Sequence, residues 1–194
     1  MKKLFLQGPR MVGKSSLLQS AIQKAECSVG GFYVKRHFNH QGIILGFELR
    51  AAKELLTKQV QPMNRDNFFI QTVNNTRCQK LAVFETFGLL LLKEAEVRKV
   101  DLILLDEIGG IELLAPQFTK ALTALIEQPR KIIGVYKSEQ NFQTQKLPAK
   151  AKQLLIQKRS ALTTAIAAQG GVVFSLTAGN RAVLERRVLT LLQA

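Results

Sequence analysis

The chain has 194 residues, 46% of them hydrophobic, which is enough to build one globular domain with a substantial core over residues 1–194. Its 28 Lys and Arg residues against 14 Asp and Glu give a net charge of +14, which predicts attraction to polyanions without saying which one. The apolar runs are too short for a signal peptide or a membrane span, so we expect a cytoplasmic protein that does not bind a membrane.

The first segment reads as a strand, a phosphate-binding loop and a helix. The strand is predicted at residues 2–7, and the helix runs to about Glu26. Between them the chain matches the Walker A pattern G-x-x-x-x-G-K-[ST] and continues into the helix as Gly8-Pro9-Arg10-Met11-Val12-Gly13-Lys14-Ser15-Ser16. We predict that these nine residues bind the phosphates of a nucleotide, with Lys14 at the β- and γ-phosphates and Ser15 as a ligand of Mg²⁺.

The middle of the chain is less regular. It predicts strands at Val29–Val34 and Ile43–Leu49, a short strand at Phe68–Ile70 and a core helix from about Cys78 to Arg98. A turn at residues 39–42 predicts that the first two of these strands form a hairpin. Cys27 and Cys78 lack metal-binding spacing, and we expect both to be buried, reduced thiols.

A second polar motif follows the apolar run that begins at Val100. This run predicts a strand buried on both faces, and it ends in Asp106 and Glu107. Ligands of open α/β sheets bind at the carboxyl ends of the strands, where phosphate loops also open. We therefore predict that Asp106 holds Mg²⁺ through water and that Glu107 orients or deprotonates an attacking water. The alternative is that both carboxylates cap the next helix.

The rest of the chain alternates helices and strands. We predict a helix at Pro116–Glu127, a strand at Lys131–Tyr136, a polar turn at residues 138–147, a helix from Pro148 to about Gln169, a strand at Val172–Leu176 and a helix at Arg181–Leu192. This alternation predicts an α/β fold, a mainly parallel sheet between two layers of helices with the hairpin added. After the last strand, Asn180 and Arg181 either line the nucleobase pocket or serve as a helix cap and a solvent-facing side chain.

Several of these motifs together resemble the small P-loop nucleoside-triphosphatase family typified by the human cancer-related nucleoside-triphosphatase. The resemblance rests on the phosphate loop and on Gly31-Phe32-Tyr33, Gly46-Phe47, Asp106-Glu107-Ile108-Gly109, Glu112-Leu113, Phe118 and Asn180-Arg181. It implies the P-loop NTPase fold and Mg²⁺-dependent hydrolysis of ATP, GTP and related nucleotides. This chain departs from the family at several polar positions, including Met11, Gly110 and residues 34–37.

We favour a nucleoside-triphosphatase in which Lys14 and Glu107 are catalytic. A further cation near the transferred phosphate is expected; Arg36, Arg159 and Arg181 are the candidates in this chain, and the alternative is that a partner subunit supplies it. Two other functions stay open. A phosphotransferase would use residues 137–159 as a basic lid over an acceptor. A nucleotide-gated module with little turnover would bind nucleic acid or protein through the positive charge, although solvated surface charge is the commoner explanation of such a balance.

Overall fold

An eight-stranded sheet organises the computed structural model, which describes residues 2–57, 59, 61–73 and 76–193. Across the sheet the order is β5 (Thr76–Gln79), β4 (Phe68–Val73), β3 (Ile44–Ala51), β2 (Val29–Phe38), β6 (Leu102–Ile108), β7 (Ile132–Tyr136), β1 (Lys3–Gln7) and β8 (Val172–Ser175). The neighbours from β2 to β8 pair in parallel, and those from β2 to β5 pair antiparallel.

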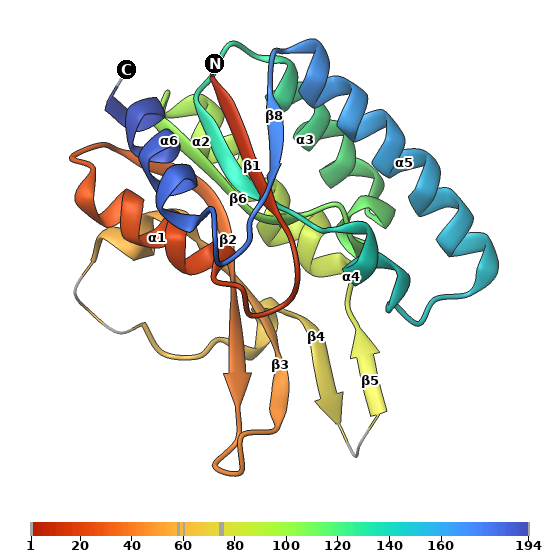
Figure 1. Cartoon of the computed structure of the whole chain (residues 1–194). Helices are drawn as coiled ribbons and strands as arrows, with labels where there is room; N and C mark the ends of the chain where they lie inside the picture. Colours follow the sequence, from red (N-terminus) through yellow and green to blue (C-terminus); the bar gives the residue numbers. More distant parts are fainter. Residues whose placement is uncertain (1, 58, 60, 74–75, 194) are drawn as a thin grey trace.

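Helices cover both faces of the parallel part (Figure 1). One face carries α1 (Lys14–Lys24) and α6 (Arg181–Gln193), and the other carries α2 (Leu89–Val97), α3 (Pro116–Glu127) and α5 (Ala149–Ala168). Side chains of one strand alternate between the two cores, so that Leu104 packs with α1 and α6 while Leu105 packs with the opposite layer. The predicted α/β fold, a mainly parallel sheet between two helical layers, is therefore confirmed.

The antiparallel strands form an arm that extends from the parallel part (Figure 1). We call β3, β4, β5 and the end of β2 from Val34 to Phe38 the arm. The predicted hairpin is present as the pairing of β2 with β3, in which Arg36 lies opposite Phe47. Short helical turns, η1 (Ala52–Leu56) and η2 (Arg65–Asn67), lie between β3 and β4. The arm is larger than the sequence predicted, because β4 and β5 continue the antiparallel sheet.

Three local predictions are wrong. Residues 76–79 form β5, so the helix predicted from Cys78 begins later, at Ala82, and continues through the π-helical turn η3 (Phe84–Gly88) into α2. All four side chains of β5 are exposed, and Cys78 is therefore not buried; it and the partly buried Cys27 are free thiols. The predicted polar turn contains α4 (Glu139–Gln143), which is capped by the side chain of Ser138.

Candidate active site

The phosphate-binding loop joins β1 to α1 at the carboxyl edge of the parallel strands. Gly8 and Gly13 have φ angles of 144° and 91°, which glycine adopts without strain. A Cβ atom at residue 8 would stand 2.7 Å from the carbonyl oxygen of Leu176, in the segment that follows β8. Both glycines of the motif are therefore required by the curvature of the loop and by its close packing against the neighbouring segment.

Lys14 folds back over its own loop. Its ammonium donates hydrogen bonds to the carbonyl oxygens of Gly8, at 3.0 Å, and Pro9, at 2.7 Å. Burial lowers the pKa of Lys14, whereas the nearby carboxylates of Glu107 and Asp106 act in the opposite direction. Lys14 and the acid pair, far apart in sequence, therefore lie close enough in space to interact electrostatically.

Asp106 is the most deeply buried acid at this edge, with 2% of its surface exposed. Burial raises its pKa to about 7; a hydrogen bond from the Ser15 side chain opposes this rise, the charge of Glu107 adds to it, and Lys14 opposes it. Its Oδ2 atom accepts no hydrogen bond from any of the residues that the structure describes. A buried, unpaired carboxylate oxygen beside a hydroxyl is a suitable ligand pair for a hard cation such as Mg²⁺.

Magnesium sites of this type need few protein ligands, because substrate phosphates and water complete the coordination. Ser15 and Asp106 therefore fit Mg²⁺ although, among the described residues, no group of three or more His, Cys, Asp and Glu side chains gathers at one point.

Lys137, which the sequence offered only as the first residue of a possible basic lid, lies at this edge. β7 lies between β1 and β6, so the end of β7 is placed between the phosphate loop and the acid pair. The Lys137 ammonium lies 2.7 Å from Oε2 of Glu107. In the sequence, Lys137 is recognisable only as a lysine directly after a buried strand. Its proximity to Glu107 follows from the strand order, which the sequence does not state.

Arg159, a candidate for the cation near the phosphate, is buried instead. Its guanidinium donates to the backbone carbonyls of Gly109 and Lys137, and its planar group lies over the rings of Phe142, at 4.5 Å, and Tyr136, at 5.0 Å. Arg159 thus fastens α5 to the ends of β6 and β7. By binding the backbone of Lys137, Arg159 supports the ion pair between Glu107 and Lys137. Because Arg159 is buried, it is not part of an open lid.

Glu112 belongs to η4 (Ile111–Leu114), and its side chain contacts the backbone of the loop that follows β6. It is buried, and its Oε1 atom accepts a hydrogen bond of 2.7 Å from the backbone N–H of Gly110. Burial raises the pKa of this carboxyl, and the hydrogen bond from Gly110 opposes the rise. The contact fixes the backbone just after the acid pair.

The segment after β7 also packs against the phosphate loop. The side-chain amide of Asn141, in α4, donates to the carbonyl of Gly8 at 3.1 Å, and the Arg10 guanidinium donates to Oγ1 of Thr144 at 2.6 Å. The loop is therefore supported from the side opposite α1.

Asn180 and Arg181 lie at the start of α6. The Asn180 side chain accepts a hydrogen bond from the backbone N–H of Thr177 and donates one to the carbonyl of Ser175, both at 2.8 Å, so it holds the turn that follows β8. The Arg181 guanidinium donates to the carbonyl of Gly13 at 3.3 Å. Arg181 therefore borders the phosphate loop and does not simply face solvent, whereas the contacts of Asn180 lie within the turn after β8. Their part in a nucleobase pocket stays a prediction.

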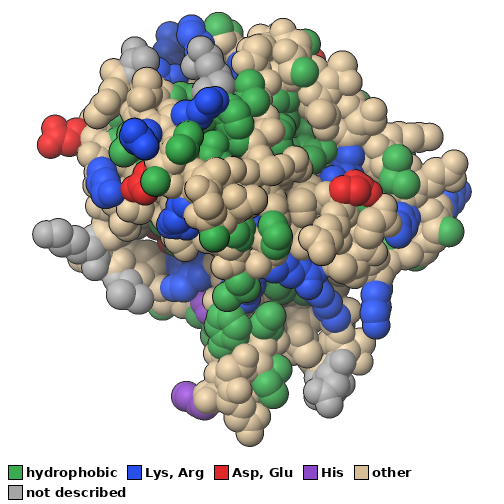
Figure 2. All heavy atoms as spheres, in the orientation of Figure 1, with side chains coloured by type: hydrophobic (Ala, Val, Ile, Leu, Met, Phe, Trp, Pro, Cys, Tyr) green, Lys and Arg blue, Asp and Glu red, His purple; other side chains and the backbone are tan. Residues whose placement is uncertain are grey.

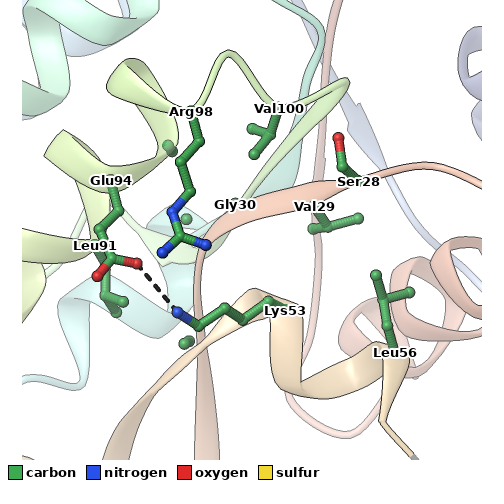
Figure 3. A pocket seen from close by; sticks show the side chains of 12 residues that line it. Ser28, Val29, Gly30, Lys53, Leu56, Leu91, Glu94, Arg98 and Val100 are labelled. Carbon is green, nitrogen blue, oxygen red and sulfur yellow. Dashed lines mark hydrogen bonds and ion pairs between the residues drawn. The ribbon is translucent and has the colours of Figure 1, made fainter.

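A pocket of about 290 Å³ lies away from these residues, between β2, η1 and α2 (Figure 3). Its lining includes Lys53 and Glu94, which form an ion pair of 3.1 Å, and the apolar side chains of Val29 and Leu91. Ser28 and Val100, which also line it, stand at the opposite strand ends from Asp106. This pocket is therefore separate from the phosphate-loop edge.

The sheet, the loop between β1 and α1 and the acid pair on β6 define a P-loop nucleotide-binding protein. The sequence model of a family described as NTPase matches residues 3–189, and the chain belongs to this family. A mouse protein, the cancer-related nucleoside-triphosphatase homolog, is 31% identical over 144 residues, which are 68% of this chain and 73% of the mouse protein.

A solved structure shows the same fold at greater sequence distance. The crystal structure of THEP1 from the hyperthermophile Aquifex aeolicus superposes with a TM-score of 0.65 and 17% identity, over the full length of both chains. Among the described residues, no helix has the length and apolar character needed to cross a membrane.

Proposed function

We propose that the protein is a Mg²⁺-dependent nucleoside-triphosphatase that hydrolyses ATP- or GTP-type nucleotides to the diphosphate and phosphate. The observation that carries this proposal is the meeting of Lys14, Asp106 and Glu107 at one edge of the sheet, beside a loop with the Walker A sequence. Family membership and the mouse relative support the same reaction class.

The phosphate groups are bound by the chain's own donors. Backbone N–H groups from Arg10 to Ser15 surround the phosphates, and the N-terminal end of α1 adds its partial positive charge. The Lys14 ammonium exchanges the carbonyls of Gly8 and Pro9 for the β- and γ-phosphate oxygens. Because that charge is already positioned, little reorganisation is needed when the nucleotide arrives.

Ser15 and Asp106 would hold Mg²⁺, which when bound neutralises part of the charge on the β- and γ-phosphates. Asp106 binds a cation as its carboxylate, so binding at a pH below about 7 requires it to release a proton.

Glu107 is the proposed water-orienting residue. It places a water molecule in line with the γ-phosphorus, and the water oxygen bonds to that phosphorus as the bond to the β–γ bridging oxygen breaks. The carboxylate receives the proton of the water, and the diphosphate keeps the bridging oxygen. Lys137, 2.7 Å from Glu107, holds this carboxylate in place, and Arg159 fixes the backbone of Lys137.

A phosphate-release assay tests the proposal. We expect the purified chain to release phosphate from at least one of ATP, GTP, CTP and UTP, with Mg²⁺ and without any acceptor. The Lys14→Ala variant should release none. Absence of phosphate release from all four nucleotides would contradict hydrolysis. Phosphoryl transfer that requires an added nucleoside or nucleotide would instead identify a kinase, and turnover-free, salt-sensitive binding of RNA or DNA would identify a binding module.

A further inference from the structure

β2 extends beyond its pairing with β6, so that its last residues belong to the arm. Tyr33 lies beside Asp106 in the pairing of β2 with β6, and Arg36 follows three residues later. At about 3.3 Å per residue, Arg36 stands about 10 Å beyond the acid pair along the strand direction. This is the side of the sheet edge on which the phosphate loop and its exposed tip, Met11, are found.

The guanidinium of Arg36 has only weak partners in the described structure. Nη1 donates to the sulfur of Met11 at 3.0 Å, and the group lies 5.5 Å from the centre of the Phe47 ring. Its Nε is buried and has no hydrogen-bond acceptor among the described residues. A thioether is a weak acceptor, and a guanidinium binds phosphate far more strongly. An anion at the loop would therefore replace Met11 as the partner of Arg36.

Arg36 is also close to the phosphate site in electrostatic terms. Burial is the main cause of the lowered pKa of Lys14, and the charges of Lys137 and Arg36 add to it, so Arg36 lies within electrostatic range of this lysine. Lys and Arg side chains are visible along the boundary between the parallel part and the arm (Figure 2). Two cations that repel one another in the free protein are both stabilised when a polyphosphate binds between them.

The other two candidate arginines are already engaged. Arg159 donates to the carbonyls of Gly109 and Lys137, and Arg181 donates to the carbonyl of Gly13. Releasing Arg159 would leave buried carbonyl groups without donors, which is costly. Among the described residues, no backbone carbonyl accepts a hydrogen bond from Arg36, so this side chain can be redirected at lower cost.

We propose that Arg36 is a catalytic residue of this site, the arginine that contacts the γ-phosphate and stabilises the charge that develops on it during hydrolysis. This inference rests on the proposed function, because it assigns a role within that reaction. The proposal also assigns a function to the arm. Its antiparallel strands hold an arginine of the same chain over the phosphate loop, so that no partner subunit has to supply one.

Arg36→Ala is the principal test, with Lys35→Ala as its matched control. Lys35 loses the same charge from the same strand, but its side chain belongs to the opposite face of the sheet. For Arg36→Ala we expect kcat to fall by about 10²–10³-fold, with the dissociation constant of ATP changed by less than about tenfold. Arg36→Lys, which keeps the charge but not the planar fork, should recover only part of the loss.

Binding of ADP with aluminium fluoride provides a second readout, because this complex imitates the phosphoryl group in transfer. Arg36→Ala should bind ADP normally but lose the additional affinity given by the fluoride complex; normal ADP binding also shows that the variant is folded. Activity of Arg36→Ala within about threefold of the wild type, or equal losses in ATP binding and turnover, would overturn the role of Arg36. A wild type without any nucleotide hydrolysis would instead overturn the proposed function itself.

Discussion

Two buried carboxylates, Glu48 in the arm and Asp106 at the phosphate-loop edge, differ in their hydrogen-bond partners. In the arm, Glu48 accepts from His37 at 2.6 Å and from Arg50 at 3.3 Å, and Arg50 also pairs with Glu54 at 2.7 Å. At the loop edge, the buried Oδ2 of Asp106 has no such partner among the described residues. Satisfied charges fix one conformation, whereas unsatisfied ones are available to a ligand.

In the part of the chain that the structure describes, the unpaired buried atoms lie near the phosphate loop, and they include one on Arg36, the arm residue that contacts Met11. Of the buried side-chain nitrogen and oxygen atoms in the described residues, those without a partner belong to Arg36, Asp106 and Gln145. The first two border the phosphate loop, and Gln145 lies beside Gly110, in the loop that follows β6. Each such atom costs stability in the free protein, so their concentration at one edge is the physical mark of a binding site.

Replacing Lys14 should have the largest effect on the loop edge. Lys14→Ala removes the ammonium that, in the proposed function, binds the β- and γ-phosphates, and we expect ATP affinity to fall by at least about 100-fold. Calorimetric titration measures this loss. The control is Lys24→Ala, at the other end of α1, where the lysine pairs with Glu185 on the surface. Unchanged ATP affinity in Lys14→Ala would mean that nucleotide binds elsewhere.

Replacing Glu48 should break the arm without touching the phosphate loop. Glu48→Ala leaves Arg50 buried with one carboxylate fewer, and we expect the free energy of unfolding to fall by about 3 kcal/mol. Urea denaturation measures the change. Glu94→Ala, which removes an exposed pairing with Lys53, should cost less than about 1 kcal/mol. Equal losses in the two variants would show that the buried network does not hold the arm.

Asp106 should give an effect of opposite sign. Its pKa rises from 3.8 to about 7 on folding, so between these values the folded protein holds a proton that the unfolded chain has lost. This contribution to stability is complete below about pH 4 and is lost as the pH rises through 7.

Asp106→Asn should therefore raise the free energy of unfolding at pH 8, by about 2–4 kcal/mol, and much less at pH 4. Urea denaturation at both pH values, without Mg²⁺ or nucleotide, measures the difference. An Asp106→Asn variant with an unchanged free energy of unfolding at pH 8 would contradict the description of Asp106 as a buried carboxylate that is destabilised when no cation is bound.

The sequence predicts the parallel part well because its signals are strong there. A buried parallel strand has a continuous apolar sequence, as in the residues before Asp106. The Walker A motif in turn predicts a strand before it and a helix after it. The position of Asp106 and Glu107 at the carboxyl edge then follows from general rules of open α/β sheets. The approach of Lys14 to this pair is consistent with the expected arrangement.

The arm and the supporting residues are harder to predict. β5 consists of Thr76, Arg77, Cys78 and Gln79, all exposed, so that it has neither apolar alternation nor a buried face to reveal it. Lys137 and Arg36 carry no motif at all. Their positions depend on the strand order, which places β7 between β1 and β6 and lets β2 pass Asp106, and a single sequence does not specify that order.

The most direct test compares wild type and Glu107→Gln in parallel measurements of ATP binding and phosphate release. We predict equal ATP affinity in the two proteins and a loss of phosphate release of at least about 100-fold in the variant, because the amide cannot accept the proton of the attacking water. Phosphate release at the wild-type rate in Glu107→Gln would contradict the central claim that the acid pair beside Lys14 is the hydrolytic centre.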